Sequence, residues 1–481
     1  MTTRTAIVWF RDDLRLDDNP ALQSALERNL LPVPVYIHAP HEEGEWAPGA
    51  ASNAWRRRSL AALAEELARR GSRLHLTRGD SLEMLQTLAR SCSAEAVFWN
   101  RRYEPAIRER DSAIKAALSD EGLNPQSFNA ALLFEPWQLS TRQNTPCKVF
   151  TPFWKTARTA GLDTRLWQAP RRLGPGTDKM PLQDRQDLDA LDMAPSPPWE
   201  QGFWQRFTPG EDGARQALGE FIEDALKGYS EHRDRPAVRS TSRLSPHLHF
   251  GEISPRRVVA AVESCTDRSH GDIDKYIAEI GWREFSYHLL YHFPETTTHN
   301  LNPRFDNFEW NAGDEETLER WRHGRTGVPI IDAGMRELWH TGWMHNRVRM
   351  LAASYLSKHL RVHWLEGARW FWDTLVDADL ANNTQGWQWT AGTGADASPW
   401  FRIFNPVTQA RRFDPGGEYV ARWLPGFEHL SASARIEPWK HPDQLRRHAP
   451  DYPGQPMVDL GEGRKRALAA YKQTGGNARS D

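Results

Sequence analysis

The sequence predicts two differently built parts: an N-terminal doubly wound, Rossmann-like α/β domain with a parallel sheet, and a C-terminal all-α domain. In the first 132 residues, short β-branched runs alternate with longer helical patterns, which is typical of a parallel sheet covered by helices. After residue 213 the strand pattern disappears and helical periodicity dominates. A chain of 481 residues is also too long for one small core, so more than one domain is expected.

Five short apolar runs near the N-terminus are expected to be buried parallel strands. They are Thr5–Phe10, Pro32–His38, Arg73–Thr77, Ala96–Asn100 and Gln126–Phe128. Between them, Asn53–Arg70 and Ser81–Arg90 carry apolar residues at helical spacing. No GxGxxG motif follows the first strand, so a dinucleotide site of that type is not supported. The carboxyl ends of the strands are still the usual place for a ligand in such sheets.

Composition indicates where the domains end. We expect the α/β domain over residues 1–132, followed by a connector rich in proline, glycine and polar residues over 133–212. A helical domain is expected over 213–453, and a polar tail that ends in disorder over 454–481.

Charge and cysteine usage limit the class of protein. The net charge is −2, so any nucleic-acid contact must come from a local basic surface. No apolar run approaches the length of a membrane span, and the N-terminus turns acidic at once, unlike a targeting peptide. Three widely spaced cysteines argue against disulfides and zinc. We therefore expect a cytoplasmic protein, associated with the nucleoid if it is bacterial.

The segment Asp377–Gln409 is the most informative stretch of the chain. Its 33 residues combine three carboxylates, two adjacent amides, one arginine and three tryptophans, the last of them Trp400. This mixture indicates the wall of a cofactor pocket. Asp377 and Asp379 would accept hydrogen bonds from a cofactor or pair with an arginine, and Asn383 offers a donor and an acceptor to a heterocycle. The alternative for the Asp-x-Asp pattern is magnesium binding.

A helix expected over Asp274–Phe293 places Tyr276, Glu279, Trp282 and Arg283 on one face. By default, a glutamate beside a tryptophan on such a face is a surface pair. If it is buried, Glu279 would be a functional carboxylate that hydrogen-bonds a substrate carbonyl when protonated.

Two further segments carry weaker signals. Thr241, Ser242 and Ser245, with the amides between them, suit a pyrophosphate, but a simple helix cap explains them equally well. In Thr341–Met350, Gly342 ends one helix, and the next places an amide, two arginines and a thioether in one turn. That set suits a planar ligand and a phosphate backbone, and a surface arginine face is the alternative.

The histidines near these segments give little sign of metal binding. His345 stands alone and is expected to be structural. His247 and His249 have no carboxylate or cysteine partner nearby in the sequence, which argues against a metal site.

Together these segments resemble the photolyase/cryptochrome family over nearly the whole chain, and in particular its class I cyclobutane pyrimidine dimer photolyases. The stretches that carry the resemblance are VWFRDDLRLDDNPAL (Val8–Leu22), STSRLSPHLHFGEISPR (Ser240–Arg256), EIGWREF (Glu279–Phe285) and TGWMHNRVRM (Thr341–Met350). The resemblance implies an N-terminal α/β domain and a helical domain that holds FAD in a folded, U-shaped conformation.

The resemblance also implies which residues bind FAD. It assigns to the flavin phosphates and ribitol Tyr229, Thr241, Ser242, Arg243, Leu244 and Ser245. The flavin-binding set further includes Tyr276, Arg283, Arg349, Asp377, Ala378, Asp379 and Asn383. In this set Arg349 would pair with Asp377, and Asn383 would face the reactive nitrogen of the central flavin ring and stabilise its reduced, anionic state.

The resemblance implies a monomer whose partner is UV-damaged DNA. It implies neither a bound metal nor association with a membrane. The implied reaction is light-driven electron transfer from reduced FAD to a pyrimidine dimer, whose cyclobutane ring then splits. Glu279 would hydrogen-bond a dimer carbonyl. Other pocket residues would be Trp282, Trp389, Asn346, Arg347 and Met350, with backbone contacts from Arg233 and Gln409. A relay of Trp387, Trp364 and Trp310 would carry electrons from the surface to the flavin.

Three other functions are weaker matches. A cryptochrome photoreceptor shares the fold and flavin, but plant receptors carry an acid where this chain has Asn383, and no long signalling extension follows the helical domain. A (6-4) photolyase would need histidines where this chain has Asn346 and Met350. A flavin- or DNA-binding scaffold without photochemistry would require Glu279 and the relay tryptophans to be mere packing.

A second, antenna chromophore on the α/β domain is also implied, either a folate or a deazaflavin. Some folate-binding relatives carry an Asn-Glu pair directly after the Tyr-Glu of the fourth strand's loop. Here Tyr103–Glu104 is followed by Pro105–Ile107, so that contact is missing, and NRRYEP looks closer to deazaflavin binders. The identity of the antenna therefore stays open.

Overall fold

The structure is a computed structural model that describes residues 4–163, 165–175, 187–195, 198–311, 313–396 and 401–475. The chain forms two compact units. Unit 1 comprises Met1–Pro198, Phe207–Lys227 and Ser242–Pro294. Unit 2 comprises Trp199–Arg206, Gly228–Thr241 and Glu295–Asp481.

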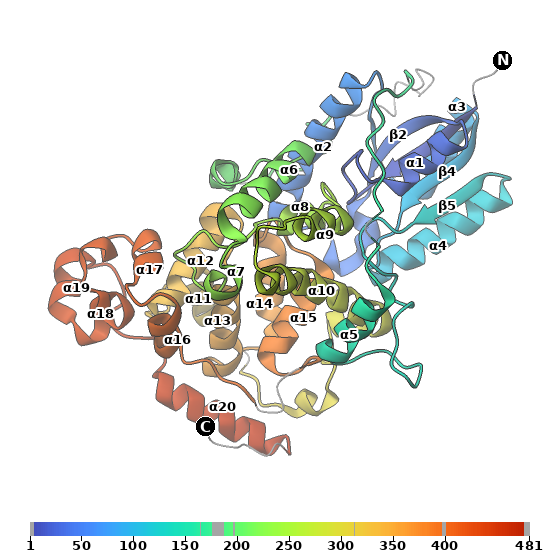
Figure 1. Ribbon diagram of the computed structural model, residues 1–481. Helices are drawn as coiled ribbons and strands as arrows, with labels where there is room; N and C mark the ends of the chain where they lie inside the picture. Colours follow the sequence, from blue (N-terminus) through green and yellow to red (C-terminus); the bar gives the residue numbers. More distant parts are fainter. Residues whose placement is uncertain are drawn as a thin grey trace. The chain divides into compact units, whose positions relative to one another are not determined.

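Unit 1 contains a five-stranded parallel sheet with strand order β3-β2-β1-β4-β5, drawn in blue and cyan in Figure 1. The strands are β1 (Thr5–Phe10), β2 (Leu31–His38), β3 (His75–Arg78), β4 (Ala94–Asn100) and β5 (Asn124–Phe128). The order reverses direction between β1 and β4, as expected of a doubly wound fold. The predicted α/β sheet is therefore confirmed.

Helices pack on both faces of this sheet. Successive side chains of a strand point to opposite faces, and every residue of β1 is buried. Ala6, Val8 and Phe10 belong to one apolar cluster with α1 (Pro20–Glu27) and α2 (Ala50–Arg69). Ile7 and Trp9 belong to another with α3 (Ser81–Cys92) and α4 (Pro105–Asp120). Burial on both sides explains why the strands read as continuous apolar runs.

The rest of unit 1 is helical. Its elements are α5 (Phe150–Ala160), α6 (Glu211–Glu220), α8 (Ser245–His249), α9 (Pro255–Glu263) and α10 (His270–His292), with short turns η1 (Pro40–Trp46) and η4 (Phe221–Ala225). The long helix α10 begins where the Ser269 hydroxyl accepts a hydrogen bond from the Asp272 N–H at 3.1 Å. It ends just before Pro294, which cannot continue a helix. α10 packs against α5 and α9.

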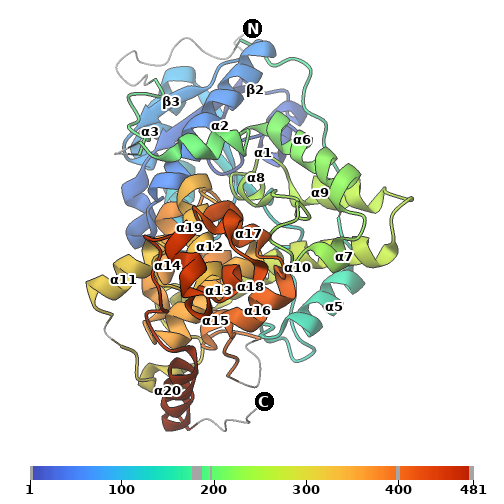
Figure 2. The same ribbon diagram turned by 90° about the vertical axis from the view of Figure 1, so that its left-hand side faces the viewer.

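Unit 2 is all-helical, which confirms the second part of the predicted fold class. Its helices are α7 (Tyr229–His232), α11 (Glu315–Arg322), α12 (Pro329–Thr341), α13 (Asn346–Ser354), α14 (Trp364–Thr374), α15 (Leu380–Ala391), α16 (Pro406–Phe413), α17 (Glu418–Trp423), α18 (Ala432–Ile436), α19 (Pro442–His448) and α20 (Leu460–Gln473). Shorter turns include η3 (Glu200–Gln205) and η7 (Tyr355–His359). Helices α12, α13, α14 and α15 lie together in Figure 2, where α13 contacts both α12 and α15, and α15 contacts α14.

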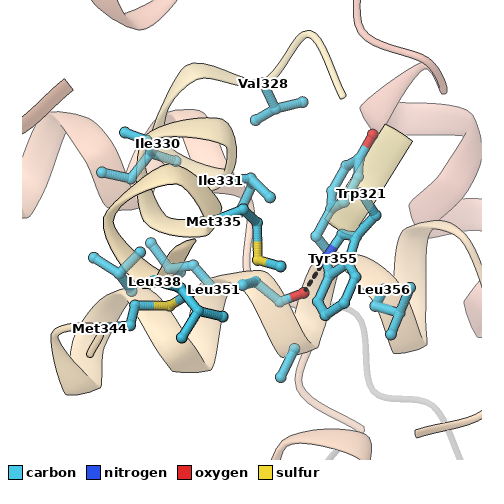
Figure 3. Packing of buried hydrophobic residues seen from close by; sticks show 14 of the residues in the cluster. Trp321, Val328, Ile330, Ile331, Met335, Leu338, Met344, Leu351, Tyr355 and Leu356 are labelled. Carbon is cyan, nitrogen blue, oxygen red and sulfur yellow. Dashed lines mark hydrogen bonds between the residues drawn. The ribbon is translucent and has the colours of Figure 1, made fainter. Parts of the chain in front are cut away.

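One large apolar cluster forms the core of unit 2. Figure 3 shows its centre, where the Trp321 indole lies among side chains of α12 and α13. Trp321 is fully buried, and its Nε1 donates to the carbonyl of Ala352 at 3.3 Å. Its ring also meets Trp387 edge-on, with centroids 6.1 Å apart. This core therefore links α11 to the helices that carry many of the predicted site residues.

The structure adds detail to the predicted domain boundaries without testing them. The connector predicted over 133–212 contains α5 and η3, and the tail predicted over 454–481 contains α20, while residues 476–481 lie outside the described part. The boundaries themselves stay predictions. Within the described ranges, every helix is too short or too polar to cross a membrane.

The core packing predicts the effect of removing Trp321. Trp321→Ala should destabilise the protein by about 3–5 kcal/mol, because it empties a fully buried indole site and removes one of the hydrogen bonds that the Ala352 carbonyl accepts. Trp339→Ala, at a position that is 38% exposed, serves as the control and should cost less. Urea unfolding followed by circular dichroism measures both. Equal losses for the two variants would contradict this description of the core.

Candidate functional site

A cleft lies beyond the carboxyl ends of β1, β2 and β4 in unit 1, where sheets of this topology bind ligands. It holds ≈ 360 Å³ of space, part of it open to solvent. Its lining is rich in arginine and aromatic rings and consists of Trp9, Arg11, Asp12, Tyr36, Ile37, His38, Ala39, Pro40, Glu43, Arg56, Arg102 and Arg110. The lining carries four arginines and two carboxylates, and further carboxylates pair with three of these arginines: Asp111 with Arg11, Glu104 with Arg102 and Glu42 with Arg110.

One carboxylate holds two of these arginines in place. Asp12 accepts a hydrogen bond from Arg56 at 3.1 Å, and its other oxygen lies 3.2 Å from Arg102 Nε. Burial alone would raise the pKa of Asp12, but the charges of Arg102 and Arg56 outweigh it and lower the pKa. Burial, with Arg56 nearby, lowers the pKa of His38 to about 4, so its imidazole is neutral at pH 7. Fixed cations beside aromatic rings suit a planar, anionic ligand.

Helix α10 carries four predicted site residues, of which two are buried. Tyr276 packs against Phe221 with ring centroids 4.4 Å apart, and burial raises the pKa of its phenol. Arg283 Nη1 donates to the carbonyl of Ala131 at 2.7 Å. Both side chains therefore help to fix α10 within unit 1, and their role in flavin binding stays a prediction.

The other two, Glu279 and Trp282, are partly exposed. Glu279 is neither a free surface residue nor a buried one: its side chain is 25% exposed, and its Oε1 lies 3.3 Å from Lys275 Nζ, one turn earlier. Trp282 stacks on Phe150, an aromatic contact that the sequence pattern did not indicate. A carboxylate and an indole are thus presented one turn apart on a helix that is otherwise mostly buried.

The residues Ser242–Ser245 form the turn that leads into α8. Arg243 has φ 54°, in the left-handed region, and Leu244 follows with φ −82° and ψ −2°. This alternation turns successive backbone N–H groups toward one side, as in anion-binding nests. Ser242 Oγ accepts from the Leu244 N–H at 3.4 Å, and no side chain caps α8. A side-chain cap of α8 is therefore not observed, and the binding of a pyrophosphate at this turn stays a prediction.

Sequence reasoning missed Glu284, which follows Arg283 on α10. Its Oε2 accepts hydrogen bonds from the N–H groups of Leu133 and Phe134 at 2.8 Å and 3.2 Å. Burial raises the pKa of this carboxyl to about 7. In the sequence it looks like one half of an exposed charge pair, and only its contacts with residues far along the chain identify it.

In unit 2, the ion pair predicted between Arg349 and Asp377 is present. Arg349 Nη2 lies 3.0 Å and 2.8 Å from the two carboxylate oxygens of Asp377, and its Nε donates to the carbonyl of Met344 at 2.7 Å. Asp377 and its neighbour Ala378 are buried, and a buried carboxylate requires such a partner. The pair ties α13 to the turn that precedes α15.

Two more predicted flavin contacts are held by α14 and α15. Asp379 is the N-cap of α15 and accepts from the backbone N–H of Asn382 at 2.8 Å. Asn383 Nδ2 donates to the carbonyl of Ala368 at 2.9 Å. Both side chains are buried and therefore have fixed orientations.

One carboxylate also connects two predicted DNA contacts. Arg347 Nη2 lies 2.7 Å from Asp234 Oδ2, and Arg233 Nε lies 3.9 Å from Asp234 Oδ1. Sequence reasoning missed Asp234, although its position between two arginines in Arg233–Arg235 was a usable signal. Tyr229, which starts α7, lies under the Arg233 guanidinium at 5.4 Å.

The start of α13 is capped by His345, in agreement with its expected structural role. Its Nδ1 accepts from the Arg347 N–H at 3.1 Å, and burial lowers the pKa of the imidazole to about 3. Asn346 is exposed, with its amide nitrogen 3.9 Å from the sulfur of Met350. On α16, Gln409 has a buried Oε1 without a hydrogen-bond partner among the described residues, and its contact with DNA stays a prediction.

The three relay tryptophans differ in burial. Trp387 and Trp364 are buried, and Trp310 is partly buried. Trp364 Nε1 donates to Asn300 at 2.9 Å. His363 contacts both Trp310 and Trp364, with ring centroids 5.1 Å and 5.5 Å away, and sequence reasoning did not identify this bridge.

The predicted residues are shared between the two units. Unit 1 holds Ser242, Arg243, Leu244, Ser245, Tyr276, Glu279, Trp282 and Arg283. Unit 2 holds Tyr229, Arg233, Thr241, Trp310, Asn346, Arg347, Arg349, Met350, Trp364, Asp377, Ala378, Asp379, Asn383, Trp387, Trp389 and Gln409. Trp389 is partly buried, and Trp400 lies outside the described residues. The nest in unit 1 and the buried carboxylates and amide in unit 2 fit the donors and acceptors that a flavin dinucleotide needs.

One sequence-based statement is wrong. His247 does have a carboxylate partner, because its Nδ1 contacts Glu252 five residues later. Glu252 also accepts from Trp55 Nε1 at 3.0 Å and from the Gly210 N–H at 2.7 Å, so this buried group is structural. No cluster of three or more His, Cys, Asp or Glu side chains in the described part of the chain could hold a metal ion.

Two family models match the chain. One, described as the FAD binding domain of DNA photolyase, covers residues 276–473, and the other, described as DNA photolyase, covers residues 6–171. The first match includes most of α10 and most of unit 2, and the second includes nearly all of the sheet and the residues that line its cleft.

The chain is also similar to individual proteins over nearly its whole length. It is 45% identical over 478 residues to a deoxyribodipyrimidine photo-lyase of Agrobacterium fabrum, with 98% of each chain covered. It is 35% identical over 486 residues to cryptochrome-2 of Arabidopsis thaliana, covering 98% of this chain and 79% of the relative. The crystal structure of a bacterial class III photolyase from Agrobacterium tumefaciens matches with a TM-score of 0.93 at 45% identity, covering 99% of each chain.

Burial of Glu284 predicts a pH-dependent stability. Its pKa is about 7 in the folded protein against 4.5 ordinarily, so its contribution to folding is fully present below about pH 4.5 and is lost as pH rises through 7. A glutamine at this position would accept the same two backbone hydrogen bonds without ionising. Glu284→Gln should therefore gain stability relative to the wild type between pH 5 and pH 8, by up to about 3 kcal/mol. Urea unfolding across this range tests it, and parallel stability curves would contradict the buried, titrating carboxyl.

Proposed function

Because this chain belongs to the DNA photolyase/cryptochrome family, we propose that it is a deoxyribodipyrimidine photo-lyase that repairs cyclobutane pyrimidine dimers in DNA under blue light. The observation that carries this proposal is the pair Glu279 and Trp282 on α10. Both are partly exposed on a helix that is otherwise mostly buried, so they are available to a ligand. A flipped pyrimidine dimer needs a hydrogen-bonding group for its carbonyls and a flat ring for stacking, and a carboxyl group and an indole supply these.

FAD is the cofactor of this chain, as predicted, because residues 276–473 match the FAD binding domain of DNA photolyase. When bound and reduced, FAD supplies the light-excited electron donor. We propose that the nest at Ser242–Ser245 holds its phosphates. Arg349 would hold Asp377 in place beside the ring system through their ion pair. Asp379 and Asn383, fixed by α15 and α14, would present their polar groups to the sugar and to the isoalloxazine.

Charged, polar and aromatic side chains would orient the lesion. When protonated, Glu279 would donate a hydrogen bond to a dimer carbonyl and stabilise the negative charge that develops there. Trp282 and Trp389 would stack on the dimer, and Asn346, Arg347 and Met350 would complete the pocket. Asp234 would hold Arg347 at the pocket and Arg233 at the DNA backbone, and the Arg233 contact would make binding salt-dependent. Gln409 would donate a hydrogen bond from its side-chain amide nitrogen to the DNA backbone.

Trp387, Trp364 and Trp310 would return electrons to the flavin from the surface. Burial of Trp387 and Trp364 would protect an oxidised indole from water. His363 contacts both Trp364 and Trp310, between which the outer transfer step of the relay would occur. Gly367 makes room for the inner ring, since a Cβ there would lie 2.0 Å from Trp387 Cη2.

The cleft in unit 1 would hold the antenna chromophore. Its arginines and its Trp9 and Tyr36 rings suit the planar, anionic character shared by folates and deazaflavins. The contact typical of some folate-binding relatives is missing after Tyr103–Glu104, so both compounds stay candidates. We also propose that the protein works as a monomer in the cytoplasm, where three cysteines so widely spaced in the sequence would stay reduced.

A cryptochrome-type photoreceptor is the second candidate, since cryptochrome-2 of Arabidopsis thaliana is 35% identical over nearly the whole chain. Asn383 favours repair, because plant receptors are expected to carry an acid at this position. The class I assignment made from the sequence stays a prediction. The Agrobacterium tumefaciens structure is that of a class III photolyase, so class III is the other assignment to test.

The proposal predicts light-dependent repair that requires Glu279. Purified, photoreduced protein should restore the thymine absorbance of a dimer-containing oligothymidine under blue light and not in darkness. Glu279→Ala should slow repair of the bound dimer by about tenfold or more, because an oriented hydrogen bond to the developing anion is lost. Glu263→Ala, on exposed surface of α9, is the matched control and should repair at the wild-type rate.

Absence of wild-type repair despite reduced flavin and measurable lesion binding would overturn the proposal and favour the photoreceptor. Equal repair by wild type and Glu279→Ala would instead remove Glu279 from the mechanism.

A further inference from the structure

One face of the Trp282 indole is covered by an aromatic ring from a distant part of unit 1. Phe150, the first residue of α5, stacks on it with ring centroids 3.8 Å apart and planes inclined by 9°. Aromatic pairs in proteins are usually separated by about 4.5–7 Å and are offset or edge-to-face, so this nearly parallel contact is unusually close. Both side chains are partly exposed, which places the stack at the surface of unit 1 and not in its core.

Neighbouring rings fix this pair from other directions. Phe285 approaches Trp282 edge-on, with centroids 5.9 Å apart and an interplanar angle of 75°. Trp154, one turn further along α5, lies parallel to Phe150 at 6.2 Å. The indole plane is therefore set on its face by Phe150 and at its edge by Phe285.

Helix α5 is held firmly against α10, so Phe150 is not a loosely placed ring. A Cβ on Gly281 would lie 2.5 Å from Trp154 Cε3, which means that this approach of the two helices needs a glycine. Phe153 is buried and contacts Phe285 and His288 with ring centroids 5.2 Å away in each case. These contacts anchor α5 while leaving Phe150 beside Trp282.

We propose that Phe150 is a positioning residue, which holds the Trp282 indole in the plane where it stacks on a pyrimidine dimer flipped out of DNA. This inference rests on the proposed function, because it takes Trp282 as a lesion contact. An indole has two faces, and since Phe150 fills one, the other receives the base. A ring fixed before binding loses little conformational freedom when the lesion arrives, so Phe150 raises affinity through pre-organisation. It does not touch the reacting bonds, and the rate of repair once the dimer is bound is independent of it.

The test compares two Phe→Leu variants on the same helix. Phe150→Leu removes the flat ring from Trp282, while Phe153→Leu removes a ring that contacts Phe285 and His288 instead. Phe150→Tyr keeps the ring and serves as the rescue, and Trp282→Leu reports on the lesion contact itself. For each FAD-loaded variant, the Kd for a dimer-containing oligonucleotide, the Kd for the undamaged oligonucleotide and the repair rate at saturation are measured.

We expect Phe150→Leu to weaken dimer binding by roughly three- to tenfold, in line with the loss of one aromatic contact. Its affinity for undamaged DNA and its saturated repair rate should match those of the wild type. Phe150→Tyr should bind the dimer within about twofold of the wild type. Phe153→Leu should leave lesion selectivity unchanged, because its ring does not contact Trp282.

Three results would overturn the inference. Unchanged dimer affinity in Phe150→Leu would show that Trp282 needs no support, and tighter binding would show that Phe150 shields the indole. Equal losses in Phe150→Leu and Phe153→Leu would indicate general loosening of α5. If Trp282→Leu is weakened and Phe150→Leu is not, only the positioning role fails. If Trp282→Leu itself binds the dimer as the wild type does, the proposed lesion contact fails as well.

Discussion

The carboxylate of Glu337 is the group on which the arrangement of unit 2 depends. It is buried, and a buried charge must be fully paired to be tolerated. Glu337 meets this demand with three elements: its Oε1 lies 3.0 Å from Arg206 Nη1, and its Oε2 accepts from the Tyr419 hydroxyl at 2.8 Å and from the His345 N–H at 3.3 Å. Since His345 is the N-cap of α13, this carboxylate determines where the helix bearing Arg347 and the other predicted contacts begins.

A second buried carboxylate that must be paired connects α13 to the turn before α15. The Arg349–Asp377 ion pair fixes the turn before α15, whose cap Asp379 and first-turn residue Asn383 then have set orientations. In unit 1, aromatic packing fixes a predicted site residue, because the rings of Phe150 and Phe285 contact the Trp282 indole on α10. In the proposed function, charge pairing thus orients the polar groups that would bind the flavin, while ring stacking orients the indole that would contact the lesion. Both would reduce the ordering that otherwise accompanies binding.

Sequence patterns predicted the features that depend on residues close together in the chain. Alternating apolar runs located the sheet, although β3 begins at His75, two residues later than predicted, because its pairing with β2 starts there. Helical spacing placed four site residues on α10, and the resemblance to a known family supplied the partner of Asp377. Asp234 lies beside a predicted residue and could have been found. The contacts of Phe150 and Glu337 could not, since each joins residues far apart in the chain and leaves no periodic signal in the sequence.

The proposed function depends on electron transfer from the light-excited flavin to a bound pyrimidine dimer, and the fluorescence lifetime of the reduced, protein-bound flavin reports this transfer. Lifetimes would be recorded with saturating dimer-containing oligonucleotide, with the same oligonucleotide undamaged, and without DNA. Transfer to the lesion opens an additional decay route, so we predict a shorter lifetime with the dimer alone and equal lifetimes in the other two samples. An unchanged lifetime with the dimer demonstrably bound would contradict the proposed function.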